Sequence, residues 1–228
     1  KNNMEEDSVI CAIATSPGMG AIAVIRVSGE GSVELCDSIF FSPSGKRLVD
    51  ALPNTVLFGQ IREGEELIDE VLATVFRSPR SFTGEDSVEI SCHGSVYIQQ
   101  RILQALIHAG ARMARPGEYT RRAFLNGKMD LTQAEAVADL VASSSAAAHR
   151  MAMNQMRGGF SSELTKLREE LLRLVALLEL ELDFSEEDVE FADRGELKEI
   201  ALRIDGWLTR LCDSFSLGNV IKNGVPVA

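Results

Sequence analysis

Two charged residues lie inside otherwise apolar, β-branched segments of this sequence. Arg26 lies within the run from Ile22 to Val27, and Glu89 lies within the run from Val88 to Cys92. A charge in such a segment costs free energy unless it is paired or reaches water. Two interpretations are open: a salt bridge, mutual or exposed, or polar groups directed into a pocket on one face of a sheet. The sequence alone favours neither interpretation.

A third candidate lies in the segment 115–131. Its residues predict one short helix, a stop at Asn126-Gly127, and a second helix that starts after an N-cap at Asp130. Lys128 is then left on the tight loop between the two helices, where a cation is exposed and held in place. Most loop lysines are simply solvated, but the neighbouring arginines make contact with an anion a stronger hypothesis here.

Charge is distributed unevenly along the chain. The net charge is −11, from 23 basic and 34 acidic residues, which argues against nucleic-acid binding by the chain as a whole. Between positions 98 and 128, however, Glu118 is the one acidic residue. An anionic ligand is a candidate occupant of that segment. Its basic residues are Arg101, Arg112, Arg115, Arg121, Arg122 and Lys128.

Nucleotide chemistry is not indicated by the glycine patterns. The stretch Gly18 to Ala23 spells G-x-G-x-x-A, but β-branched residues follow it where a dinucleotide-binding turn needs a helix. A hairpin-like connection is the better interpretation. The P-loop pattern G-x-x-x-x-G-K-[ST] does not occur in the sequence, so we expect no hydrolysis of GTP or ATP by this chain.

Metal and disulfide chemistry are not indicated either. The 4 cysteines and 3 histidines show no ligand spacing, so we expect no metal site and regard the cysteines as small buried residues. Cys92 and His93 are adjacent, and on a strand they would point to opposite faces.

The pattern of elements changes near position 130, and we expect two domains, 1–128 and 129–228. In the first, short β-rich runs at 9–14, 22–27, 56–61, 71–76 and 88–92 alternate with helical stretches at 33–41 and 96–109. This indicates an α+β domain. The second lacks proline from position 117 to 225, and its apolar spacing predicts an all-α domain: a helix from Leu131 through Met156, a heptad-like leucine helix after Gly158-Gly159, and another before Gly218.

Several ordered motifs together resemble the MnmE (TrmE) family of bacterial tRNA-modification GTPases. The resemblance covers essentially the whole chain and is specific because the motifs occur in order at matching separations. They are Ala14-Thr15-Ser16-Pro17-Gly18, Ile25-Arg26-Val27-Ser28-Gly29, Ser81-Phe82-Thr83-Gly84-Glu85-Asp86, Val88-Glu89-Ile90, Cys92-His93-Gly94, Ala114-Arg115-Pro116-Gly117-Glu118 and the run from Arg122 to Ala136.

The resemblance implies an architecture. The N-terminal domain would have the folate-binding fold of glycine-cleavage aminomethyltransferases and form a homodimer, and a helical domain would follow it. A GTPase domain that uses GTP, potassium and magnesium would be inserted into the helical domain. The stretch Gly224 to Ala228 would then be the first strand leading into that domain, outside this chain.

The resemblance also implies a function. The intact protein would act with the flavoprotein MnmG to add an aminomethyl-type group at C5 of the wobble uridine (U34) of tRNA, with 5-formyl- or methylene-tetrahydrofolate as the carbon donor. Matching motif positions place the folate site at Arg26, Glu89 and Lys128. Glu89 is the expected pterin-recognition residue, since one carboxylate can accept two neighbouring N–H groups. Arg26 and Lys128 would contact the polar substituent or the glutamate tail.

Two other functions are compatible with the same residues. One is a stand-alone folate-dependent aminomethyltransferase, and the other is a structural helical scaffold in which Arg26 and Glu89 merely pair. For all three functions we expect a cytoplasmic protein without a membrane partner. No apolar stretch approaches the length of a spanning helix, and the first residues lack a signal peptide's pattern. No catalytic residue is expected in this chain.

Overall fold

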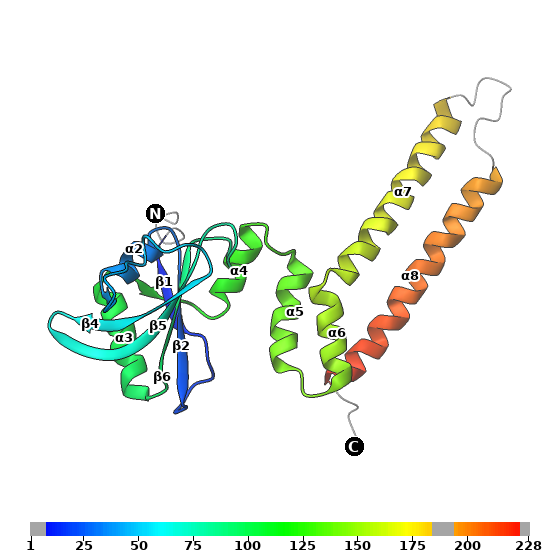
Figure 1. Cartoon of the computed structure of the whole chain (residues 1–228). Helices are drawn as coiled ribbons and strands as arrows, with labels where there is room; N and C mark the ends of the chain where they lie inside the picture. The colour runs from blue at the N-terminus through cyan, green and yellow to red at the C-terminus, as the bar shows by residue number, and fades with distance from the viewer. Residues whose placement is uncertain (1–7, 184–193, 224–228) are drawn as a thin grey trace, which may run out of the picture. The chain divides into compact units, whose positions relative to one another are not determined.

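The fold is described from a computed structural model, which defines residues 8–183 and 194–223 (Figure 1). The predicted strand start at Gly224 to Ala228 lies outside these residues. The chain divides into two compact units, residues 1–129 and 130–228, which are treated separately below. Within the described ranges, no helix combines the length and the apolar character that crossing a membrane requires.

The first unit is built on a seven-stranded sheet in the order β3-β4-β5-β6-β2-β1-β7. Neighbouring strands are antiparallel except β1 and β7, which are parallel. The predicted strands are confirmed, although β4 and β5 are longer than expected. The strands are β1 (Ile10–Ile13), β2 (Ile22–Ser28), β3 (Phe40–Phe41), β4 (Thr55–Glu63), β5 (Glu66–Phe76), β6 (Ser87–His93) and β7 (Arg112–Met113).

The sheet buries one face against helices. Alternate residues of β2, Ala23, Ile25 and Val27, are fully buried and pack with Ile102 and Leu106 of α3 (Val96–His108). Because side chains on a strand alternate between faces, Arg26 and its neighbours of the same parity project from the opposite face. That opposite face carries the candidate site. Strand β2 pairs antiparallel with β1, so a hairpin-like connection at the glycine-rich stretch is confirmed.

Two further helices complete this unit: α2 (Ser32–Asp37) and α4 (Glu118–Leu125). The expected helix at 33–41 ends early, because Phe40–Phe41 leaves the helical path and pairs with Gln60 and Ile61 of β4. The expected short helix before Asn126-Gly127 is confirmed as α4, and Gly127 has a φ of 68° that suits glycine.

The second unit is entirely helical in its described residues, with α5 (Leu131–Ala142), α6 (Ala146–Met156), α7 (Gly159–Asp183) and α8 (Arg194–Asn223). The predicted N-cap at Asp130 is confirmed and forms a capping box, since the Asp130 side chain accepts from Gln133 N while the Gln133 side chain accepts from Asp130 N. The continuous helix expected through Met156 is interrupted, because Ser145 caps α6 by accepting from Ala148 N.

Helices α7 and α8 form a long pair, visible in Figure 1. Their described core joins Leu167 to Ile200 and Ile204, which confirms the amphipathic patterns read from the sequence. Helix α8 continues to Asn223, so the expected stop before Gly218 is wrong. An α+β unit followed by a helical unit is therefore confirmed as the coarse fold class.

Candidate ligand site on the open face of the sheet

Arg26 and Glu89 are cross-strand partners at the centre of the sheet's open face. The register of β2 and β6 places them directly opposite each other. Arg26 Nε donates to Glu89 Oε1 at 2.9 Å, and Arg26 Nη2 lies 2.7 Å from the same oxygen. The pair is half-buried, with 27% and 29% of the two side chains exposed. The salt bridge that the sequence left open is present, and it also faces solvent.

Glu89 keeps one carboxylate oxygen unengaged. Both guanidinium contacts fall on Oε1, and among the residues that the structure describes Oε2 has no hydrogen-bond partner. An ionised carboxylate offers about four lone-pair positions. Glu89 can therefore accept an N–H group from a ligand through Oε2 without losing Arg26. In the paired recognition that the resemblance implies, with one N–H group on each oxygen, Oε1 would be shared with Arg26.

Two aromatic rings flank the Arg26 guanidinium. Its Cζ lies over the ring of Phe82 at 5.1 Å and over the ring of Tyr119 at 5.7 Å, both within the range of cation–π contacts. The Tyr119 hydroxyl also donates to the Arg26 carbonyl at 2.6 Å. Burial raises the pKa of that phenol, so it remains a donor at neutral pH. The site thus combines a carboxylate, a guanidinium and two rings.

Lys128 lies beside the loop that carries Phe82 but does not touch the ion pair. Its ammonium donates to the Pro79 carbonyl at 2.8 Å, and within the described residues it makes no hydrogen bond or ion pair with Arg26 or Glu89. A Cβ added to Gly84 would lie 3.1 Å from Lys128 Cγ, so the lysine stem packs on this glycine. The structure therefore joins two of the three predicted residues directly, and the third contacts the loop 77–86 instead.

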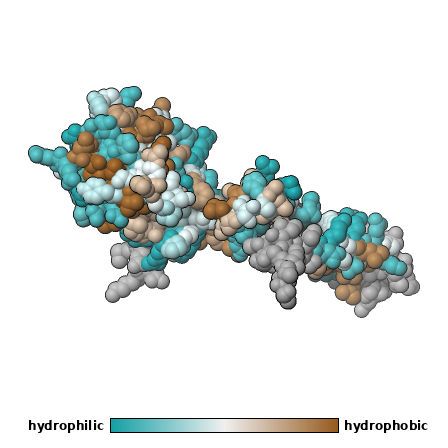
Figure 2. Space-filling model, turned by 90° about the horizontal axis from the view of Figure 1, so that it is seen from below, coloured by the Kyte–Doolittle hydropathy of each residue, from teal (hydrophilic) through white to brown (hydrophobic). Residues whose placement is uncertain are grey.

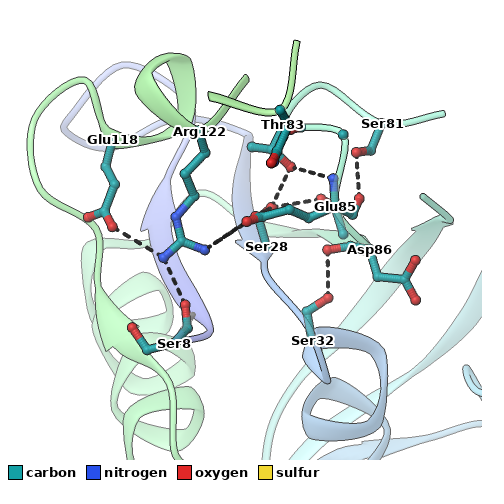
Figure 3. A network of polar contacts seen from close by, with 12 residues as sticks. Ser8, Ser28, Ser32, Ser81, Thr83, Glu85, Asp86, Glu118 and Arg122 are labelled. Atoms are coloured by element: carbon teal, nitrogen blue, oxygen red, sulfur yellow. Dashed lines mark hydrogen bonds and ion pairs between the residues drawn. The ribbon is translucent and has the colours of Figure 1, made fainter. Parts of the chain in front are cut away.

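The loop 77–86 is fixed to the sheet by buried hydroxyl groups (Figure 3). Ser28 Oγ lies 2.7 Å from Thr83 Oγ1 and donates to Glu85 Oε2 at 2.9 Å. From the other side, the Asn126 amide donates to the Thr83 carbonyl at 2.8 Å. Ser28 and Thr83 are fully buried, so the loop covers this end of the open face. Arg26 and Glu89 lie just beyond the covered end.

Helix α4 is tied to the same loop by a buried arginine. Arg122 Nη1 lies 3.2 Å from Glu85, and Arg122 Nη2 donates to the Ser8 carbonyl at 2.8 Å (Figure 3). The same guanidinium contacts Glu118 at 3.3 Å. Hydrogen bonds from Arg112, together with the Arg115 backbone N–H, lower the pKa of Glu118 to about 2. This network holds α4, and with it Tyr119, against the sheet.

Acidic partners neutralise three of the basic residues in segment 98–128, where an anion was expected to bind. Arg101 contacts Glu63 at 3.1 Å and Glu66 at 2.8 Å, both from the β4–β5 hairpin. Arg112 and Arg122 are engaged by acidic partners within the network just described. Sequence distance hid Glu63, Glu66 and Glu85, whereas Glu118 lies within the segment itself. Lys128 has an exposed side chain and donates to a backbone carbonyl.

An open cavity of about 760 Å³ is lined in part by the loop 77–86, and its lining does not include the predicted site residues. Four of its lining residues are acidic: Glu30, Glu34, Glu85 and Asp86. Such a lining repels an anionic ligand, so we do not place the folate site there.

The cysteine and histidine candidates have structural explanations. Cys11, Cys36 and Cys92 are buried, as expected, whereas Cys212 is exposed. Cys92 is buried while the adjacent His93 is exposed, so they do face opposite ways. His93 Nδ1 lies 2.7 Å from Asp69 Oδ1.

Sequence reasoning did not single out Phe82 and Tyr119 as site residues. Phe82 lies in a quoted motif and Tyr119 directly follows another, but nothing in their local patterns connects them to Arg26, which is 56 and 93 positions away. The sequence does indicate that the loop as a whole could contribute to a site. Ser81 to Asp86 is mostly polar, lacks secondary-structure periodicity and precedes the strand that carries Glu89.

Comparisons with known proteins match both units. A family model described as the N-terminus of the GTP-binding protein TrmE matches residues 9–128, and one described as the MnmE helical domain matches residues 131–226. A relative from Bacteroides fragilis named tRNA modification GTPase MnmE is 63% identical over 226 residues, which cover 99% of this chain and 48% of the relative.

Relatives with the same name occur in other bacteria. The one from Porphyromonas gingivalis is 59% identical over 96% of this chain and 46% of its own length, and the one from Flavobacterium johnsoniae is 57% identical over 99% and 48%. This chain spans about half the length of the curated relatives it matches. Two matching family models cover nearly all its residues, and the chain therefore belongs to the MnmE (TrmE) family.

Proposed function

We propose that this chain is the folate-binding and dimerising part of a tRNA-modification GTPase. Together with the flavoprotein MnmG, the whole protein adds an aminomethyl-type group at C5 of the wobble uridine (U34), in the cytoplasm, with a tetrahydrofolate derivative as the carbon donor. The first unit has the fold of the folate-binding aminomethyltransferases. GTP, potassium and magnesium are used by sequence outside this chain. Family membership and the names of the relatives support this proposal.

The observation that carries the proposal is the half-exposed Arg26–Glu89 pair with its unengaged oxygen. A pterin presents a ring N–H and an exocyclic amine side by side, and Glu89 Oε2 is available to one of them. A hydrogen bond to a charged acceptor contributes about 1.5–3 kcal/mol. Lys128 supplies a cation for the anionic glutamate tail, since its ammonium is exposed and, in the part of the chain that the structure describes, donates to a neutral carbonyl.

A structural scaffold remains the competing function, because it predicts the observed ion pair. In that function Arg26 and Glu89 only neutralise each other's charges on the sheet, and the pair binds no ligand. The open position of the pair and the free oxygen favour ligand binding over a purely structural bridge. The distinction is experimental, and it requires a variant that keeps the shape of Glu89 while removing its charge.

The test is a calorimetric titration of the 228-residue chain with 5-formyltetrahydrofolate. We expect saturable binding by wild type and at least about tenfold weaker binding by Glu89→Gln, since a charged hydrogen bond is lost. Glu70→Gln is the matched control, because Glu70 is an exposed glutamate on β5 that contacts Gln60. If the folded wild type does not bind, folate binding is contradicted and the structural scaffold is supported. If Glu89→Gln binds as tightly as wild type, the folate site does not include Glu89.

The proposed homodimer has an apolar surface available in the first unit. Phe58 of β4 and Leu72 of β5 are cross-strand partners, and Val56 follows on the same face. These three side chains are 51%, 47% and 54% exposed. Figure 2 shows apolar patches between hydrophilic side chains on this unit. An exposed cross-strand apolar cluster on an uncovered sheet face is typical of a protein interface.

Sedimentation velocity tests the homodimer. Phe58→Lys places a charge within the cluster, so we expect the chain to shift from dimer to monomer. Leu52→Lys is the control, because Leu52 is 74% exposed and lies outside the strands that form the cluster. A wild type that sediments as a monomer at high concentration would contradict dimerisation, and a dimer retained by Phe58→Lys would place the interface on another surface.

A further inference from the structure

We propose that Phe82 and Tyr119 are positioning residues that set the orientation of the Glu89 carboxylate through the Arg26 guanidinium. This inference rests on the folate binding proposed above and concerns the same site. It assigns a role to two rings that the sequence did not single out.

Arg26 contacts a single carboxylate oxygen of Glu89. An arginine and a carboxylate commonly pair through two parallel hydrogen bonds, each to a different oxygen. Here Nε and Nη2 of Arg26 both contact Oε1 of Glu89, at 2.9 and 2.7 Å. The fork is therefore turned away from the bidentate arrangement. In the bidentate arrangement Oε2 would be occupied, and a ligand N–H would have to compete with Arg26 for it.

Two aromatic rings hold the Arg26 guanidinium in this orientation. Arginine carries about 2 kcal/mol of side-chain rotamer entropy, so a half-exposed one does not stay fixed without contacts. The rings of Phe82 and Tyr119 lie at 5.1 and 5.7 Å from its Cζ. The Tyr119 hydroxyl holds the backbone at the same residue through the Arg26 carbonyl. The rings thus restrain both the head and the base of Arg26.

Each ring is itself held in place by its neighbours in the chain. Phe82 precedes Thr83, whose hydroxyl and carbonyl are bonded to Ser28 and Asn126 respectively. Tyr119 follows Glu118, which is buried and bonded to two arginines of the network. Two segments that are distant in sequence therefore converge on Arg26 with fixed geometry, as positioning requires.

The experiment measures affinity for 5-formyltetrahydrofolate by calorimetry in ring variants. We expect Phe82→Leu and Tyr119→Leu each to weaken binding about two- to fivefold, the equivalent of one cation–π contact. Tyr119→Phe retains the ring and should recover most of the affinity. Tyr97→Leu is the matched control, because Tyr97 lies on α3 and is 65% exposed; its affinity should equal that of wild type.

A second measurement separates positioning from direct ligand contact. The Arg26 Nε–H signal in ¹H–¹⁵N spectra of the ligand-free chain, assigned by its loss in Arg26→Met, should move when Phe82 is replaced by leucine. Weaker binding with an unmoved Arg26 signal would overturn the inference, since the ring would then act on the ligand itself. Unaltered binding by both leucine variants would also overturn it.

Failure of the proposed function is distinguishable from failure of this inference. If folded wild type does not bind the folate, folate binding fails and the positioning role fails with it. If wild type binds and Glu89→Gln does not, while the ring variants bind normally, the inference alone fails. Should Phe82→Leu be unable to fold, the comparison of Tyr119→Leu with Tyr119→Phe tests the same role, with the Arg26 signal as its readout.

Discussion

Arg122 on α4 contacts both carboxylate oxygens of Glu85 at 3.2 Å and so joins this helix to the loop between β5 and β6. Glu85 also accepts a hydrogen bond from Ser28 on β2. One arginine thereby connects three segments that are separated along the chain. From the sequence, Arg122 belonged to a basic segment that could hold an anion; in the structure it is an internal cation with its own acidic partners.

Replacing Arg122 with methionine should therefore destabilise the first unit strongly. The side chain is only 6% exposed, and its removal leaves the buried carboxylate of Glu118 with one fewer cation. Breaking a buried ion pair by removing one partner costs about 3–5 kcal/mol. Urea unfolding followed by circular dichroism measures this loss. Arg203→Met is the control, because that arginine is 43% exposed and its ion pairs lie on the surface of the helical unit; a similar loss in both variants would contradict the prediction.

Stability should fall in acid partly because of Glu118. Its pKa is about 2 in the folded chain, held down by Arg112, against about 4.3 when unfolded. A lowered folded pKa means that the stabilisation is fully present above about pH 4.3 and is lost as the pH falls towards 2. The shift corresponds to about 3 kcal/mol. Urea midpoints between pH 7 and 2.5 should therefore fall less steeply in Glu118→Gln, which starts from a lower stability; parallel curves for the two proteins would refute the assignment.

The sequence predicted the sheet and most helices because their signals are local. Alternating β-branched residues fix β2 and β6, and the Asp130–Gln133 capping box starts α5 where expected. The errors occurred where tertiary contacts override local pattern. Phe40–Phe41 continues an apolar helical spacing but gains ladder hydrogen bonds with β4. Gly218 breaks no helix, since its propensity cost of about 1 kcal/mol is small within a 30-residue element.

The candidate site was predictable only in part, for a similar physical reason. Arg26 and Glu89 were identifiable because a charge inside an apolar strand violates a local rule. Phe82 and Tyr119 violate none: one is in an irregular loop and the other is in the first turn of a helix. Their meeting at Arg26 depends on the packing of α4 and the loop onto the sheet. No sequence spacing encodes that contact.

Gly94 should not tolerate a side chain. A Cβ built there would lie 2.3 Å from the Gly20 carbonyl oxygen, which is backbone and cannot move aside without breaking the paired hydrogen bonds between these two segments. We expect Gly94→Ala to destabilise the chain by about 3 kcal/mol, within the range of strong overpacking. Gly206→Ala is the control: it lies in α8 with open space, so alanine should stabilise it by about 0.5–1 kcal/mol. Thermal unfolding compares the two, and equal effects would contradict the steric argument.

A side chain at Gly84 should displace the side chain of Lys128. It has a φ of 82°, and an added Cβ would lie 3.1 Å from Lys128 Cγ and 3.2 Å from Asn126 Cβ. Gly84→Ala therefore combines backbone strain with displacement of the lysine stem. The backbone part alone is about 1 kcal/mol.

Gly45→Ala isolates that backbone part, because Gly45 has a φ of 71° and no atom within 4 Å of the added Cβ. Both variants should lose similar stability from strain, with a further loss in Gly84→Ala. Only Gly84→Ala should weaken binding of 5-formyltetrahydrofolate, by several-fold, because it moves the ammonium proposed to meet the glutamate tail. If Gly84→Ala binds the monoglutamate as well as Gly45→Ala does, Lys128 does not contact the ligand, and the site reduces to Glu89 and Arg26.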